Sequence, residues 1–440
     1  MVLLVLASTP VFAQNNITSS PYSLFGIGDP LSLNNTMGFS MGDVKYAMSR
    51  PFYLNYANPS SYANLKAATF SVGAMLNRTR TFNSETTQDN DNGTLRYFGL
   101  GIPITDRMGI AIGARPYTSL GYGIQIDSEI TYPSTLETRY EGEGGMNIAY
   151  GGIGYEILKD SVSSLNLGIN ANFYFGNNKQ TALNKLVNST GALSSIYLSN
   201  YVTSDFGFDI GLNYSVNLNQ LFHSGSKKEQ NLTFGGTFSI PTDLDTKFEY
   251  FSGSYYSVNN VLIITDTLEY RLDTTSIYIP ERYGFGINYQ IMNRHTNSLW
   301  IIEADYEYNG WSGLTINNNE TQLKNSVRYS MGAQFIPNAN GIRGFFSLLR
   351  YRVGANYRTT RIDLGGEQIV DMSVSAGFGI PLVKSKSIYS SASTVDFGVL
   401  VGSRGTEDNG LIREQYTNIY IGLSFSPNYW DRWFKKRKIN

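Results

Sequence analysis

The chain has 440 residues, of which 34 are Lys or Arg and 35 are Asp or Glu, so its formal net charge of −1 provides no general attraction for nucleic acid. It contains no cysteine, which excludes disulfide scaffolds, thiolate metal ligands and cysteine nucleophiles. Charged residues make up 16% and aromatic residues 14% of the chain, whereas soluble domains carry about 25% charged residues, and this composition favours a membrane barrel over a soluble domain.

Residues 1–13 combine an apolar run with small residues at Val11 and Ala13. This pattern is typical of the hydrophobic region and cleavage site of a secretory signal peptide, so we expect export. No later apolar run approaches the ~18 residues that a membrane helix requires. Any membrane-spanning part must therefore be made of strands, which cross lipid only as a closed barrel.

Residues 14–66 do not alternate between apolar and polar positions. They contain Pro30, Pro51 and Pro59 together with several glycines. Proline interrupts strand ladders and glycine permits tight turns, so this stretch predicts a compact, turn-rich segment.

From residue 67 to residue 427, apolar and polar side chains alternate with a period of two. Between Asp205 and Asn219 the even positions run from Phe206 to Leu218 and are all apolar or aromatic, whereas the odd positions are Asp, Gly, Asn or Ser. One face of such a strand suits lipid and the other suits water or a packed lumen. A soluble β-sandwich would alternate as well, but its polar face would be richer in Lys and Glu and its strands shorter.

The alternation predicts an all-β fold, a transmembrane antiparallel barrel of about fourteen strands. The expected strands are 67–82, 94–104, 107–126, 137–158, 163–176, 201–219, 230–250, 280–293, 298–310, 324–337, 342–361, 367–383, 391–405 and 413–427. The connections at 83–93, 177–200 and 251–279 are long and polar, whereas those that alternate with them along the chain, such as 293–297, are mostly tight. Long external loops and short periplasmic turns are typical of outer-membrane barrels, which predicts both termini in the periplasm. A lumen of this width needs water or a plug, so we expect residues 14–66 to form a hatch inside it.

A Met- and Gly-rich stretch from Met37 to Asp43 and the sequence Asn58-Pro59-Ser60 precede the barrel. With the barrel pattern, they resemble the outer-membrane long-chain fatty-acid transporter superfamily of the FadL/TodX type, which also includes barrels of the type IX secretion system. The resemblance implies a lumenal hatch that carries an Asn-Pro-Ala motif, with Ser60 replacing the alanine here. It also implies that wall kinks, one of which Pro241 predicts, can form lateral exits.

Two groups of residues are candidates for function. A hydrophobic ligand would contact Phe25, Phe39, Phe52 and Tyr53, beneath the outer loops. A lumen charge network is predicted from inward-facing positions: Glu303, Asp305, Glu307, Arg328, Arg350, Arg352 and Arg358. Charges in a low-dielectric wall need partners, so we interpret this network as a brace for the lumen or the hatch, in preference to an ion pathway or a catalytic carboxylate pair.

Residues 428–440 form an aromatic and basic tail. Trp430, Trp433 and Phe434 suit a membrane interface, and the basic run 435–438 suits lipid headgroups or a periplasmic partner. The alternative is a frayed polar end.

The sequence leaves two functions open. The first is passive transport of small hydrophobic compounds through a hatch-gated lumen in the bacterial outer membrane. The alternative is a plugged structural barrel that serves as a subunit of a secretion or outer-membrane assembly complex. The expected partners are outer-membrane lipid and either a hydrophobic ligand or such machinery, without nucleic acid. We expect no enzyme activity, no cofactor and no metal, since His223 and His295 are the only histidines and lie far apart.

Overall fold

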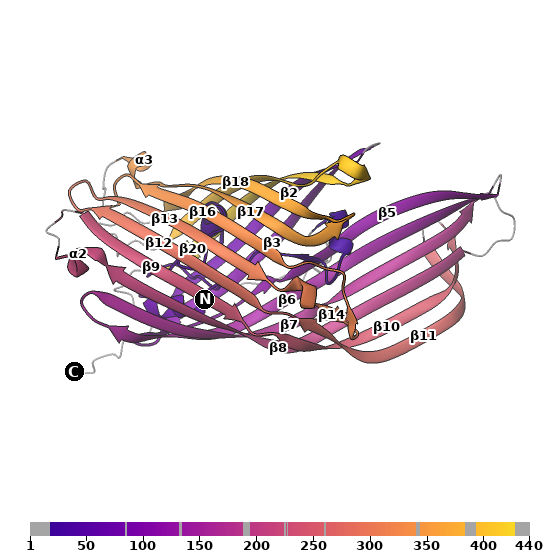
Figure 1. Cartoon of the computed structure of the whole chain (residues 1–440), viewed down its shortest axis with the longest axis horizontal. Helices are drawn as coiled ribbons and strands as arrows, with labels where there is room; N and C mark the ends of the chain where they lie inside the picture. Colours follow the sequence, from indigo (N-terminus) through magenta and orange to yellow (C-terminus); the bar gives the residue numbers. More distant parts are fainter. Residues whose placement is uncertain are drawn as a thin grey trace, which may run out of the picture.

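The computed structural model describes residues 18–83, 86–131, 134–187, 194–223, 226, 228–258, 261–339, 344–382 and 393–426. The predicted signal peptide, 1–13, and the predicted tail, 428–440, lie outside these residues. Within the described ranges, no helix is both long and apolar enough to cross a membrane. The long strands form one antiparallel sheet that encloses the amino-terminal segment (Figure 1).

The sheet closes into the predicted antiparallel barrel of 14 strands. Closure occurs where the first wall strand pairs with the last, from Phe70 opposite Phe425 to Phe82 opposite Arg413. In chain order the wall consists of β2 (Thr69–Phe82), β3 (Thr87–Pro103), β4 (Met108–Pro116) with β5 (Thr118–Thr131), β6 (Ser134–Lys159), β7 (Ser163–Val187), β8 (Ser194–Asn217), β9 (Lys228–Ser239) with β10 (Thr242–Val258), β11 (Val261–Ile279) with β12 (Arg282–Asn293), β13 (Ser298–Asn309), β16 (Ser326–Ile336), β17 (Arg350–Leu364), β18 (Glu367–Pro381), β19 (Thr394–Gly405) and β20 (Arg413–Phe425).

Each of the three paired labels is one barrel strand that is interrupted next to a proline. The prolines are Pro116 at the end of β4, Pro241 between β9 and β10, and Pro280 between β11 and β12. Proline has no N–H to donate to a neighbouring strand, so the ladder breaks there. The sequence predicts the break at Pro241, and the other two have the same cause.

The two ends of the barrel differ (Figure 1). We call the end where β2 begins and β20 ends the terminal end. It carries the short helices α2 (Leu218–Leu221) and α3 (Phe345–Leu348). We call the opposite end the loop end. There β5, β6, β7, β8, β10 and β11 extend well beyond the other strands.

Longer strands correct the three predicted long loops. In the first of them, 83–93, the residues from Thr87 onward belong to β3 and pair with β2. Residues 177–187 and 194–200 continue the β7–β8 hairpin, and most of 251–279 belongs to the β10–β11 hairpin. Both faces of these hairpins carry polar side chains, so the period-two apolar signal is missing although the backbone ladder continues.

The alternation of exposed and buried side chains follows the sequence pattern. On β8 the Phe206 side chain is 56% exposed, whereas Asp209 is only 5% exposed. Large apolar side chains thus cover the outside of the barrel, and polar ones face the lumen. This arrangement suits a wall surrounded by lipid.

Val374→Arg on β18 is therefore expected to destabilise the barrel in a bilayer by about 2–4 kcal/mol, because Val374 faces outward, 62% exposed, where we place the lipid. Leu268→Arg is the matched control, since Leu268 is 66% exposed but lies on the β11 extension at the loop end. Unfolding of both variants in lipid vesicles by denaturant measures the difference. Equal losses would contradict a lipid-facing wall at Val374.

The hatch fills the lumen with short elements: η1 (Pro21–Leu24), β1 (Asp29–Pro30), α1 (Thr36–Phe39) and η2 (Pro59–Asn64). Asn35 caps α1, because its side chain accepts from the Gly38 N–H. β1 pairs with the start of β5, and the Leu31 N–H donates to the Tyr117 carbonyl at 2.9 Å. The hatch therefore supplies backbone partners at the break between β4 and β5.

A second set of short elements lies beside the break between β11 and β12. It consists of η3 (Trp311–Gly313), β14 (Thr315–Ile316) and β15 (Asn319–Glu320). A separate short helix, η4 (Asp408–Gly410), connects β19 to β20. β14 pairs with Ile277 and Tyr278 of β11, and the Gly310 N–H donates to the Glu281 carbonyl at 3.0 Å. This interruption is thus also bridged by hydrogen bonds.

Candidate functional site

The hatch backbone lies directly on glycines of the barrel wall. A Cβ atom on Gly235 would lie 2.0 Å from the Tyr46 carbonyl oxygen, and one on Gly332 would lie 2.1 Å from the Met41 carbonyl oxygen. Real Cβ atoms do not approach backbone so closely, so only glycine fits. These wall glycines, with Gly109, Gly168 and Gly354 in the same role, form sockets for the hatch.

The predicted hatch motif joins two parts of the hatch to β8. The Asn58 amide donates to the Tyr46 carbonyl at 2.7 Å and to the Leu212 carbonyl of β8 at 3.2 Å. Its oxygen accepts from the Ser60 N–H at 3.2 Å and from the Ser60 hydroxyl at 2.7 Å, which caps η2. Pro59 packs on the backbone of Gly168 and Gly211. Serine in place of the motif's alanine thus adds a buried hydrogen bond.

Three inward carboxylates of β13 bind the hatch turn at residues 45–47. The N–H groups of Lys45 and Tyr46 donate to Asp305 at 2.5 and 3.0 Å. The Tyr46 hydroxyl donates to Glu307 at 2.6 Å, and Glu303 accepts from the N–H of the next hatch residue at 3.2 Å. These carboxylates therefore act as acceptors for hatch donors that the lumen would otherwise leave unpaired.

Ion pairs join the hatch to the wall at the same level. The Lys45 ammonium lies 2.8 Å from the Glu307 carboxylate and 3.6 Å from that of Asp43. Asp43 also accepts a hydrogen bond from Arg328 of β16 and one from the Ser32 hydroxyl at 2.6 Å. All four charged residues are at least nine-tenths buried. Such pairs hold a geometry because each charge needs its partner.

The remaining predicted network residues lie on β17. Arg352 pairs with Asp396 of β19 at 2.6 Å, and Arg358 pairs with Asp371 of β18 at 2.6 Å. Arg350 instead lines a cavity at the terminal end. The sequence identifies these arginines but not their acidic partners, because the pairing register of the strands was unknown.

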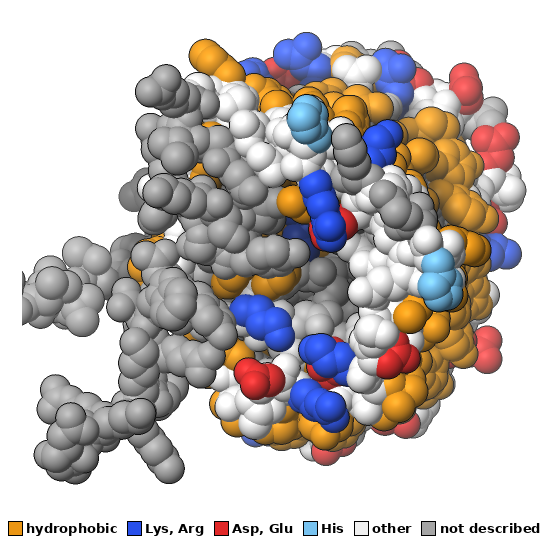
Figure 2. Space-filling view, turned by 90° about the vertical axis from the view of Figure 1, so that its left-hand side faces the viewer, with side chains coloured by type: hydrophobic (Ala, Val, Ile, Leu, Met, Phe, Trp, Pro, Cys, Tyr) orange, Lys and Arg blue, Asp and Glu red, His pale blue; other side chains and the backbone are white. Residues whose placement is uncertain are grey.

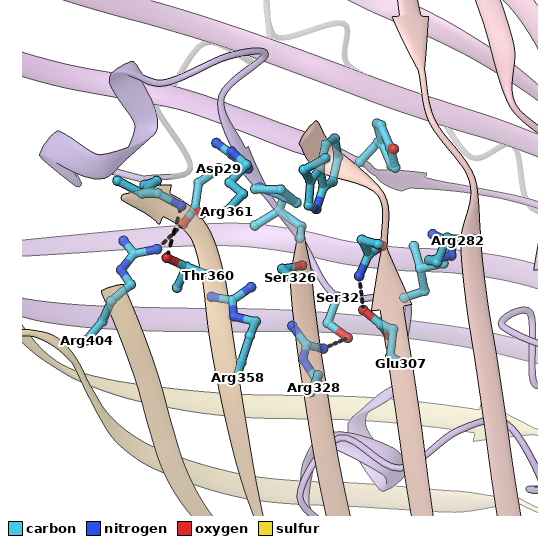
Figure 3. Close-up of a pocket in the computed structure, with 17 residues that line it drawn as sticks. Asp29, Ser32, Arg282, Glu307, Ser326, Arg328, Arg358, Thr360, Arg361 and Arg404 are labelled. Atoms are coloured by element: carbon cyan, nitrogen blue, oxygen red, sulfur yellow. Dashed lines mark hydrogen bonds and ion pairs between the residues drawn. The ribbon is translucent and has the colours of Figure 1, made fainter. Parts of the chain in front are cut away.

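Two cavities lie between the hatch and the loop end. The smaller, about 50 Å³, is lined by Arg282, Arg358, Arg361 and Arg404 as well as Asp29 (Figure 3). Arg404 pairs with Asp29 at 2.8 Å, and Arg361 donates to the carbonyl of Gly28 at 2.5 Å. The second cavity, about 150 Å³, adjoins it toward β20. Their charges are mostly satisfied by each other and by hatch backbone.

The four predicted ligand residues do not share one cavity. Phe39 stacks on Tyr420 at 4.4 Å and lines the 150 Å³ cavity. Phe52 and Tyr53 line a cavity of about 160 Å³ at the terminal end. Phe25 packs against buried apolar side chains elsewhere. Within the part of the chain that the structure describes, no three or more His, Asp or Glu side chains are placed to hold a metal ion.

The charged surroundings of Asp43 predict that the seating of the hatch depends on pH. Burial alone would raise the pKa of its carboxyl, but Lys45, Arg328 and hydrogen bonds from Ser32 and Asn34 together hold that pKa below its usual range. A carboxyl group whose pKa is lower in the folded than in the unfolded state stabilises the fold. This stabilisation is fully present when the pH is above the pKa of the unfolded state, about 3.9, and is lost as the pH falls through the pKa of the folded state.

We therefore expect the contribution of Asp43 to the free energy of unfolding of the hatch to stay constant between pH 5 and 7. It should be lost at strongly acidic pH, where the carboxylate becomes protonated. Denaturant titrations in detergent at a series of pH values measure this, with Asp43→Asn as the comparison that removes the acid-dependent part. A difference between wild type and Asp43→Asn that already declines between pH 7 and pH 6 would contradict the assignment.

The closed barrel and its lumenal hatch define a FadL-like outer-membrane barrel, and solved structures agree with this fold. The toluene transporter TbuX of Ralstonia pickettii shares 12% identity with a TM-score of 0.53, covering 90% of this chain and 99% of TbuX. The toluene transporter TodX of Pseudomonas putida shares 13% identity with a TM-score of 0.51, covering 92% and 100% of the two chains. A FadL homologue of Pseudomonas aeruginosa shares 11% identity with a TM-score of 0.51, covering 91% and 100%.

The family can be stated from the sequence itself. The model of the BamG family matches residues 1–440, so the chain belongs to that family. No curated protein matches the chain.

Proposed function

We propose that this protein is a plugged structural barrel that serves as a subunit of an outer-membrane assembly complex. The observation that carries the proposal is the seating of the hatch, whose backbone occupies the glycine sockets and whose buried charges pair with the wall. The cavities left beside it are at most about 160 Å³ among those described, whereas pockets for ordinary ligands measure about 300–1,000 Å³. The family name, which points to the barrel assembly machinery, supports the same function.

In this proposal the terminal end faces the periplasm, where other subunits are accessible. Short turns at that end and extended strands at the other are the arrangement typical of outer-membrane barrels. The terminal end also exposes aromatic side chains, with Phe222 beside α2 and Phe345 and Phe346 on α3, of which Phe346 is 74% exposed. Exposed aromatic residues are enriched at protein interfaces.

Depletion of the protein tests the proposal. We expect the folded fraction of other outer-membrane barrels to fall, and wild type supplied in trans to restore it. Phe345→Ser with Phe346→Ser should restore it less well, whereas Leu268→Ser at the loop end should restore it fully. Electrophoretic heat modifiability measures the folded fraction. Normal barrel assembly after depletion would overturn the proposal.

The second candidate is passive transport of small hydrophobic compounds. It is supported by the fold shared with TodX and TbuX and by the three wall interruptions, which could open sideways if the hatch moved. Uptake of labelled toluene and of labelled fatty acid by depleted and complemented cells separates the candidates. A loss of uptake with normal barrel assembly would support transport, and a defect in assembly with unchanged uptake would support the structural subunit.

A further inference from the structure

A cavity at the terminal end lies between the hatch and the ends of five wall strands. Its volume is about 160 Å³, and its lining includes the hatch turn from Arg50 to Tyr53. Across the cavity lie the starts of β9, β13 and β17 and the ends of β12 and β16. Most of the lining side chains are half-buried, so the cavity communicates with solvent. Figure 2 looks onto this end and shows a central hollow with Lys and Arg side chains around it.

Two arginines of the lining have no acidic partner. Arg50 and Arg350 form no salt bridge with any carboxylate among the described residues. The Arg50 Nη1 donates to Gln334 at 3.4 Å, while its Nε and Nη2 atoms are shielded from solvent and have no hydrogen-bond partner among the described residues. The carboxylate in the lining, Glu229, pairs with the exposed Arg294 outside the cavity.

The surroundings of Arg50 are electrostatically unfavourable for its own charge. Burial, followed by the neighbouring Arg352 and Arg350, lowers the pKa of Arg50 to about 10, against a smaller opposing effect of the Glu303 carboxylate. A buried cation normally pairs with an anion and satisfies its donors. The hatch thus holds a guanidinium whose complement is not supplied by the described residues.

The lining also has an apolar part, which consists of the side chains of Phe52, Met292, Leu299, Ile301 and Ile336. The neutral polar residues of the lining are Ser49, Asn231 and Gln290. A dry cavity of about 150 Å³ accommodates a benzene-sized group. A pure hydrocarbon would leave the guanidinium unpaired, and an inorganic anion would leave the apolar wall without contacts. Only a group that is anionic at one end and apolar at the other complements both.

We infer that this cavity binds an anionic amphiphile, with a carboxylate or phosphate between Arg50 and Arg350 and a short apolar stem against Phe52, Leu299 and Ile336. Guanidinium groups bind both kinds of oxyanion through paired N–H donors. The site opens at the terminal end, on the opposite side of the hatch from the two loop-end cavities. A fatty acid and a lysophospholipid share this chemistry and differ in the head group.

Binding to the purified full-length barrel in a non-ionic detergent tests the inference. The probes are octanoate for the carboxylate source, octyl phosphate for the phosphate source, octanol for the stem alone and inorganic phosphate for the head alone. We expect one of the two anionic probes to bind at least tenfold more tightly than octanol and inorganic phosphate, measured by calorimetry. The tighter one identifies the head group.

Variants assign the binding to this cavity. Arg50→Gln with Arg350→Gln should weaken binding of the preferred probe at least tenfold, whereas Arg107→Gln, an exposed arginine at the same end, should leave it unchanged. If the double variant fails to fold, Leu299→Trp fills the cavity while keeping both charges, and should also abolish binding. Octanol binding as tightly as octanoate and octyl phosphate, or unchanged binding in Leu299→Trp, would overturn the inference. The measurement uses the isolated barrel, so its result is independent of the assembly experiment.

Discussion

Gly235→Val is expected to unseat the hatch. The new Cβ would lie 2.0 Å from the Tyr46 carbonyl oxygen and 2.6 Å from the Ala47 Cα, and neither backbone atom can rotate away. Overpacking a well-packed site costs about 1–3 kcal/mol, and more where backbone must move. Displacement of this turn would also break the hydrogen bonds from Lys45 and Tyr46 to Asp305.

Two measurements report the unseating. Trypsin should cut the variant after Lys45 while leaving wild type intact there, as mass spectrometry of the digest would show, and planar bilayers should show increased conductance. Gly236→Val is the matched control, because the neighbouring position has its closest heavy atom at 3.9 Å. Equal protection of the two variants from trypsin would contradict the socket.

Lys45→Met is expected to destabilise the protein by about 3–5 kcal/mol, because it removes the cation from between two buried carboxylates. The ammonium lies 2.8 Å from Glu307 and 3.6 Å from Asp43, and Lys45 is almost completely buried. Methionine keeps the length of the side chain, so the loss is mainly electrostatic. Denaturant unfolding in detergent measures the change.

The matched control for this change is Lys179→Met. Its ammonium lies 2.6 Å from Glu143 on the extended hairpins, where the two side chains are 36% and 54% exposed. Exposed ion pairs contribute about 0–1 kcal/mol, so this variant should be nearly neutral. If Lys45→Met were equally neutral, the hatch would not be held by buried charge.

The wall could be predicted from the sequence because lipid imposes a strict rule on every second side chain. Phe206 and Val374 obey it, and the barrel closes at the predicted first and last strands. Strand residues that extend beyond the lipid need not alternate between apolar and polar side chains. The hairpin extensions at 177–187 and 194–200 were therefore expected to be loops. Their pairing depends on backbone hydrogen bonds that leave no apolar period.

The site was only partly predictable. Glu303, Asp305 and Glu307 stand out as inward charges, but their partners in residues 45–47 lie more than 250 positions away, and no local pattern encodes that contact. The glycine sockets were also missed, although inward glycines opposite a plugged lumen were a usable signal. Phe39 and Phe52 lie at different cavities because the hatch turns between them.

The glycine sockets constrain the order of events during biogenesis. They lie on five strands, β4, β7, β9, β16 and β17, and at each of them the hatch backbone is too close to leave room for a Cβ atom. If the barrel closed first, the hatch residues Tyr46 and Tyr62 would have to enter the closed lumen and reach contacts that leave no room beside the wall glycines. We therefore expect the wall strands to assemble around the amino-terminal segment, so that the pairing of β2 with β20, which closes the barrel, forms last.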